Sequence, residues 1–65
     1  MYELDELKAD VPDVAELGDA LARDVRLVSN AGSRESFVEH LDAAEQHAID
    51  MLREIRGLLI KARKS

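Results

Sequence analysis

Two histidines and a nearby aspartate are the residues of this chain best suited to holding a metal ion. His40 and His47 are seven residues apart, about 10.5 Å along a helix, which is too far for both to bind one ion. A carboxylate-bridged di-metal bundle uses Glu-x-x-His, whereas Asp50 follows His47 in the reverse order. A dimer would bring two copies of the three residues together, so a metal-binding bundle is one alternative. We expect no metal and no cofactor, and predict that the histidines flank a helix interface and pair with acids across it.

The other polar residues do not form a recognisable catalytic set. The three glycines are isolated, so the chain has no phosphate-binding loop. Acidic pairs such as Glu35 and Glu39 have an i,i+4 spacing, which is typical of a solvated helix face. Tyr2 and Phe37 are the two aromatic residues, too few to line a catalytic pocket. We therefore expect the protein not to be an enzyme.

Positive charge is concentrated at the C-terminal end of an otherwise acidic sequence. Residues 1–52 carry 13 acidic and four basic side chains, whereas residues 53–65 carry one acidic and five basic. The five are Arg53, Arg56, Lys61, Arg63 and Lys64. Cations complement the dipole at the C-terminal end of a helix, which is the interpretation we favour. A small nucleic-acid-associated regulator that uses these five residues is the alternative, although a net charge of −5 disfavours nucleic acid as a partner.

A heptad repeat in the second half of the chain is the strongest structural signal. Apolar residues recur at alternating steps of four and three over nearly four heptads, which predicts a long helix over about residues 33–62. These residues form the predicted self-association seam: Phe37, Leu41, Ala44, Ala48, Met51, Ile55, Leu58 and Ala62. Val38, Leu52 and Leu59 widen the stripe, which is typical of a bundle helix with more than one neighbour.

The N-terminal end of this long helix is marked by turn and capping residues. A turn is predicted over residues 30–33, and either Ser33 or Ser36 can be the N-cap. Ser36 and Glu39 have the spacing of a capping box.

A second amphipathic helix is predicted upstream, over about residues 12–29. Pro12 is tolerated in its first turn, where Asp10 or Asp13 can accept hydrogen bonds from free amides. Tyr2–Leu7 predicts a short helical turn before it. The apolar residues of the second helix are Val14, Leu17, Leu21, Val25 and Val28.

These elements predict an all-α antiparallel helical hairpin, a single domain over residues 1–65. We expect the helix over 12–29 to cover the long helix only as far as about residue 52. The apolar residues then left uncovered are Ile55, Leu58, Leu59, Ile60 and Ala62. Either Tyr2–Leu7 or another subunit can cover them. Because a two-helix hairpin encloses no core, we predict that two hairpins pair into a homodimeric four-helix bundle.

Composition narrows the class of protein. Hydrophobic residues make up 46% and charged residues 35% of the chain, a mixture typical of soluble amphipathic helices. No apolar run approaches the ~18 residues of a membrane helix, and an acidic N-terminus is unlike a signal peptide. The chain has no cysteines, so we expect a cytoplasmic location. The predicted function is a non-catalytic, regulatory protein–protein interaction module that self-associates, with a further protein partner of unknown identity.

The layout, a helical hairpin of some 60 residues that is expected to dimerise, is similar to that of the plasmid copy-number proteins that bind paired RNA loops. The resemblance implies a dimeric hairpin and RNA as a ligand. The first long helix departs from it, because its four acidic side chains outnumber its two arginines. An acidic surface is poorly suited to RNA.

Overall fold

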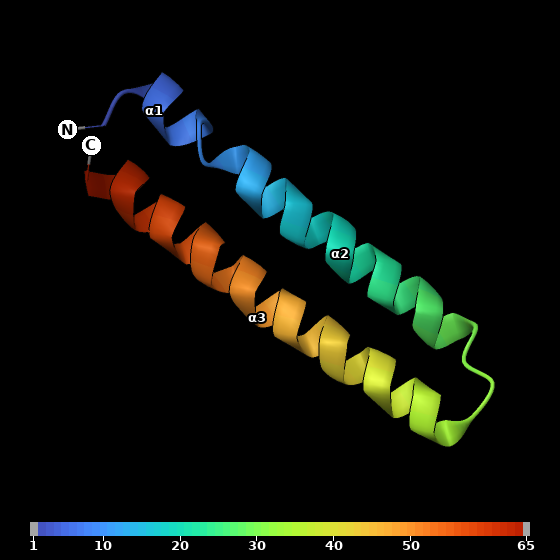
Figure 1. Cartoon of the computed structure of the whole chain (residues 1–65). Helices are drawn as coiled ribbons and strands as arrows, with labels where there is room; N and C mark the ends of the chain where they lie inside the picture. Colours follow the sequence, from blue (N-terminus) through green and yellow to red (C-terminus); the bar gives the residue numbers. More distant parts are fainter. Residues whose placement is uncertain (1, 65) are drawn as a thin grey trace.

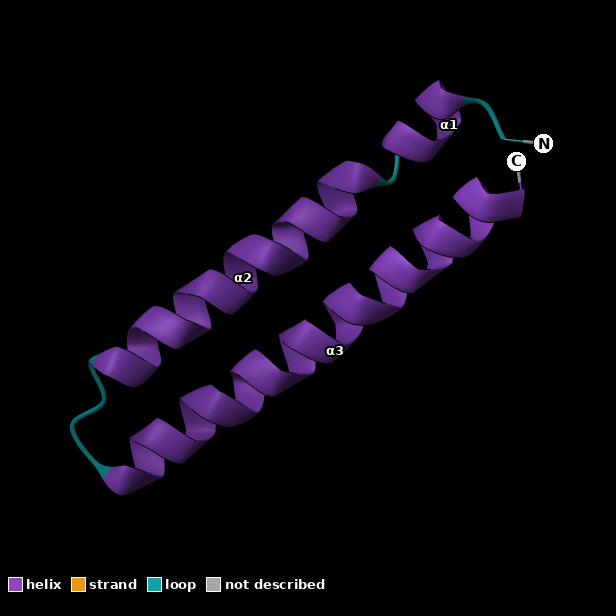
Figure 2. Ribbon diagram, turned by 180° about the vertical axis from the view of Figure 1, so that it is seen from behind, coloured by secondary structure: helices purple, strands orange, loops and turns teal. Residues whose placement is uncertain are grey.

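The computed structural model describes residues 2–64, which form three α-helices. They are α1 (Leu4–Lys8), α2 (Val11–Ser29) and α3 (Arg34–Lys64). α2 and α3 lie side by side in antiparallel directions, and the short α1 continues the line of α2 after a bend (Figure 1). Every regular element in the described part of the chain is helical (Figure 2). The expected all-α helical hairpin is therefore confirmed.

Ser33 begins α3. Its Oγ accepts a hydrogen bond from the backbone N–H of Ser36 at 3.1 Å, which satisfies one of the free amides of the first turn. Ser36 is already the third residue of the helix. The predicted capping box of Ser36 and Glu39 is therefore wrong, because a capping box starts at the N-cap.

The start of α2 differs from the expected side-chain cap. Asp10 occupies the N-cap position with a helical backbone (φ −88°, ψ −10°) and makes no capping hydrogen bond. Its carboxylate instead lies 3.6 Å from Lys61 Nζ on α3. Pro12 explains the break from α1, because a continuous helix would need its missing N–H to donate to the Lys8 carbonyl.

The bend before α2 places the N-terminal residues over the end of α3. Lys61 Nζ lies 5.6 Å from the ring centroid of Tyr2, within range of a cation–π interaction. Leu4 and Leu7 line one groove together with Leu58 of α3. The N-terminal segment thus packs on its own chain, which is one of the two arrangements that the sequence left open.

Two contacts fix the register of α2 against α3. Asp24 meets His47 near the loop, and Asp10 meets Lys61 at the open end; in both pairs the residue numbers add up to 71. α2 therefore reaches well past residue 52 of α3, and the expected limit of its cover is wrong. The first turn of α3 extends beyond the end of α2 (Figure 1). In addition, side chains lean toward the N-terminus of their own helix. On two antiparallel helices they therefore lean toward opposite ends of the hairpin, and a contact joins residues whose Cα atoms lie at different heights.

The hairpin is too thin to enclose a core. It measures 50 × 15 × 10 Å, and its radius of gyration is 15.2 Å, against about 11 Å for a compact domain of this length. Its accessible surface is 5165 Å², about 1,000 Å² more than that of a compact monomer of 7.2 kDa. Among the described residues only Ala44 and Asp24 are buried. Large apolar side chains consequently stay half-exposed along both helices.

The assignment of the N-cap is tested by replacing each serine in turn. We expect Ser33→Ala to lower the free energy of unfolding by about 1 kcal/mol, because the first turn of α3 loses its acceptor. Ser36→Ala is the matched control and should change it little. Urea unfolding followed by circular dichroism, at one fixed chain concentration, measures both. A larger loss for Ser36→Ala would contradict the assignment.

Gly57 offers a stabilising substitution. A Cβ at this position meets no atom within 4 Å, and alanine costs less backbone entropy than glycine inside a helix. We expect Gly57→Ala to raise the free energy of unfolding by about 0.5–1 kcal/mol. Gly32 also has open space around a Cβ but lies outside the helices, so Gly32→Ala should gain less. Thermal unfolding of the two variants compares them, and an equal gain would argue against a helical origin.

Candidate interaction surface

Asp24 and His47 form a polar contact between α2 and α3. The distance from His47 Nδ1 to Asp24 Oδ2 is 2.5 Å. The Asp24 side chain is 11% exposed and that of His47 is 36% exposed. A carboxylate this buried requires a hydrogen-bonding partner, because the desolvation of an unpaired charge is costly. The expected pairing of a histidine with an acid is found for His47, within one chain.

Sequence reasoning missed Asp24, although a signal for it exists. Leu17, Leu21, Asp24 and Val28 follow one another at steps of four, three and four, so Asp24 occupies a position in the apolar stripe of α2. The neighbouring Val25, which the sequence suggested for that position, is 51% exposed. A charged residue at a stripe position indicates a partner on the facing helix, here His47.

The candidate metal ligands do not converge within the described part of one chain. Within residues 2–64, no group of three His, Cys, Asp or Glu side chains could hold a metal ion. His40 and His47 are two turns apart on α3, and Nδ1 of His47 is occupied by Asp24. Asp50 brings no third ligand to either histidine.

The residues of the heptad seam face two different sides of α3. α2 and α1 cover one side of it, where the seam residues are buried or half-buried: Ala44, Met51, Ile55 and Leu58. The remaining seam residues are exposed: Phe37, Leu41, Ala48 and Ala62. A single helix covers only part of a stripe this wide. Half of the predicted seam therefore lies inside the hairpin and half faces outward.

The outward half belongs to a continuous surface, which we call the apolar face. On α3 it consists of Val38, Leu41, Ala48, Leu52 and Leu59, all exposed. On α2 it consists of Val11, Ala15, Ala22 and Val25, also exposed. With about 100° of rotation per residue, each set lies on one side of its helix. Each set lies about a quarter turn from the residues that face the other helix, in the same sense of rotation along the chain. Because α2 and α3 run in opposite directions, this shared offset places both sets on the same side of the hairpin. Glu45 is the one charged residue within the stripe on α3.

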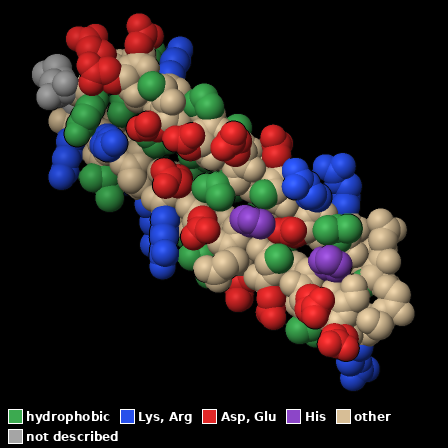
Figure 3. All heavy atoms as spheres, in the orientation of Figure 1, with side chains coloured by type: hydrophobic (Ala, Val, Ile, Leu, Met, Phe, Trp, Pro, Cys, Tyr) green, Lys and Arg blue, Asp and Glu red, His purple; other side chains and the backbone are tan. Residues whose placement is uncertain are grey.

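The opposite side of the hairpin is polar. Figure 3 shows this side, with the two histidines near one another and acidic side chains along the upper helix. Leu27 is the exposed large apolar residue that belongs to this side by its helical position. The hairpin therefore has one apolar and one polar long face, which is the pattern of a layer that packs against another layer.

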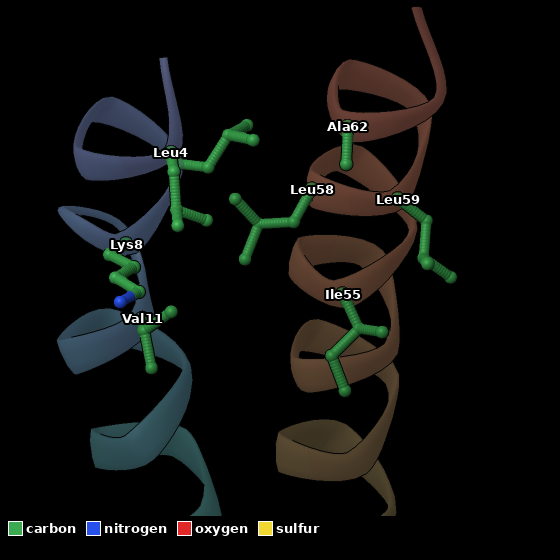
Figure 4. Close-up of a pocket in the computed structure, with 8 residues that line it drawn as sticks. Leu4, Lys8, Val11, Ile55, Leu58, Leu59 and Ala62 are labelled. Carbon is green, nitrogen blue, oxygen red and sulfur yellow. The ribbon is translucent and has the colours of Figure 1, made fainter. Parts of the chain in front are cut away.

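An apolar groove of about 320 Å³ lies at the open end of the hairpin. Leu58 points across it from α3 toward α1 and α2, and Leu59 lies on its outer side (Figure 4). Lys8 is the one polar residue in its lining, so nothing there would orient a polar ligand. The lining residues are Leu4, Leu7, Lys8, Val11, Ile55, Leu58, Leu59 and Ala62.

The basic residues at the end of α3 lie on one broad half of the helix. With about 100° of rotation per residue, an arc of about 160° contains all five: Arg53, Arg56, Lys61, Arg63 and Lys64. Arg53 and Lys61 line a shallow depression together with two acids, Asp10 and Glu54. Acidic neighbours thus interrupt the positive charge that a phosphate backbone would contact.

Comparison with protein-family models, with curated proteins and with solved structures gives no match for this chain. Across the described residues, none of the helices combines the length and the hydrophobicity that crossing a membrane requires.

A double-mutant cycle tests the contact between Asp24 and His47. We expect Asp24→Asn and His47→Gln each to destabilise the fold, and the double variant to lose less than the sum of the two. The coupling should be about 1 kcal/mol, because each single change leaves a partner unsatisfied. Urea unfolding at constant pH and chain concentration measures it. The control cycle uses Asp42→Asn and His40→Gln, for which we expect no coupling.

Proposed function

We propose that this protein is a non-catalytic, regulatory interaction module that acts by self-association. Two hairpins join through their apolar faces into a homodimeric four-helix bundle. The observation that carries the proposal is the apolar face itself, a row of half-exposed large side chains that runs the length of the hairpin. Contiguous exposed apolar surface of this kind marks interaction sites in soluble proteins.

The extent of the surface supports a partner of similar size. The hairpin exposes about 1,000 Å² more than a compact monomer of its mass. A specific protein–protein interface buries about 800 Å² on each partner, so one additional layer of two helices accounts for the excess. A second hairpin also supplies an apolar face of the same width and length. The resulting bundle has the enclosed interior that a single hairpin lacks.

The alternatives have less support. A nucleic-acid regulator would need a positive surface, and acidic residues interrupt the basic end of α3. A metal-binding bundle would need at least three converging ligands, which the described residues of one chain do not supply. The proposal includes a cytoplasmic location, which the absence of cysteine from the sequence supports. It leaves the polar face available to a further protein partner.

The mass of the protein in solution tests the proposal. Light scattering after size exclusion, at about 50 μM chain, should give twice the 7.2 kDa mass of one chain. Leu52, which is 48% exposed on the apolar face, would be desolvated in the bundle. Leu52→Glu should therefore weaken association by about tenfold or more, because burying an unpaired carboxylate is costly.

A matched substitution on the polar face provides the control. Leu27 is 40% exposed, so Leu27→Glu introduces the same charge at a similar exposure and should leave the dimer intact. Circular dichroism verifies that both variants keep their helices. A wild-type chain that stays monomeric at several hundred micromolar would overturn the proposal. Equal weakening by both variants would show that the apolar face is not the interface.

A further inference from the structure

We infer that the second copy docks on the apolar face in the antiparallel sense, with the loop end of each hairpin beside the open end of its partner. This inference rests on the proposed self-association and adds its orientation. Two hairpins that stack face to face can be related by a two-fold axis along the helices or across them. The first places both loops at the same end and α3 against the partner's α2. The second places both loops at opposite ends and α3 against α3.

The spacing of the apolar face on α3 fits the axis that crosses the helices. Leu41 and Leu59 are equally far from residue 50, as are Ala48 and Leu52. Val38 has the exposed Ala62 as its counterpart, and Glu45 has the half-buried Ile55 at the edge of the face. An axis at this level brings Leu41 beside the partner's Leu59. It also brings Ala48 beside the partner's Leu52, so that a small residue faces a large one. Such alternation lets two apolar surfaces interlock.

The spacing on α2 has its centre at the same level of the hairpin. Val11 and Val25 are equally far from Gly18, and Ala15 and Ala22 are three and four residues from it. A Cβ built at Gly18 would lie 3.4 Å from Cε of Met51. Gly18 thus contacts Met51, which is adjacent to residue 50 at the centre of the stripe on α3. One two-fold axis therefore serves both helices, and the absence of a side chain at Gly18 lets the two α2 helices approach where they cross it.

Charge favours the same orientation. Glu45 lies within the apolar face of α3, and Arg56 lies at its edge on the other side of residue 50. The antiparallel dimer brings Glu45 beside the partner's Arg56, and symmetry repeats the pair. These two residues are about 16 Å apart along one helix, so they cannot pair within a chain. The dimer with both loops at one end would instead place Glu45 against the partner's α2, away from the partner's Arg56, and complementary charge sets orientation.

The antiparallel arrangement also fills the groove at the open end. Phe37 is the one phenylalanine of the chain and is 44% exposed near the loop. The same symmetry places Phe37 level with residue 63 of the partner and Leu41 level with the partner's Leu59. Both therefore reach the groove that Val11 and Leu58 line. Each groove is completed by the loop end of the other chain, which gives the dimer two identical contacts.

Spin-label distances distinguish the two orientations. The chain has no cysteine, and Gly32 near the loop has open space around a Cβ, so Gly32→Cys gives a single labelling site. Pulsed electron paramagnetic resonance should give a distance of about 50 Å between the labels of an antiparallel dimer. A dimer with both loops at one end would give less than about 25 Å. The short distance would overturn this inference and preserve self-association, whereas a monomeric mass would overturn both.

A charge exchange tests the predicted pair directly. Glu45→Arg should raise the dimer dissociation constant by about tenfold, because two attractive contacts become repulsive. Adding Arg56→Glu should restore the wild-type constant, since the charges are then exchanged rather than removed. Glu39→Arg, an exposed acid on α3 away from the apolar face, is the matched control and should have little effect. A loss that Arg56→Glu does not reverse would contradict the antiparallel pairing.

Discussion

Two helices packed side by side have no enclosed interior, and the other properties of this molecule follow from that limit. Each helix touches its neighbour along one strip, and its remaining apolar residues face solvent. Here the described residues include only two buried side chains, Ala44 and Asp24. The burial of apolar surface, which normally stabilises a domain through the hydrophobic effect, is thus small within one hairpin. A second layer of helices, as in the proposed dimer, would bury the rest.

The contact between Asp24 and His47 decides which residues remain uncovered. A charged residue in the strip between α2 and α3 leaves few ways to pack them, because its carboxylate must reach a partner. With Asp24 facing His47, Met51 and Leu58 turn inward, while Leu41 and Leu52 turn outward. A polar contact within the hairpin thereby sets the composition of the apolar face.

Much of the fold could be predicted from the sequence because it depends on local properties. The apolar periodicity, the turn over residues 30–33 and the position of Pro12 located all three helices to within about two residues, and the structure confirms the hairpin. The candidate site was predicted only in part. Periodicity identified a stripe too wide for one partner, but it could not assign Ala44 to the interior and Ala48 to the surface. That division depends on how α2 is rotated and shifted against α3.

The sequence by itself thus determined which segments are helical, where each helix ends and that apolar surface is in excess. These properties follow from neighbouring residues and from composition. The tertiary structure alone decided the register of α2 on α3 and the position of the N-terminal segment. It also placed two separate sets of apolar residues on one side of the hairpin. These features depend on contacts between residues far apart in the chain, such as Asp24 with His47 and Asp10 with Lys61. No local pattern specifies such contacts, because the same stripe fits a neighbouring helix in several rotations.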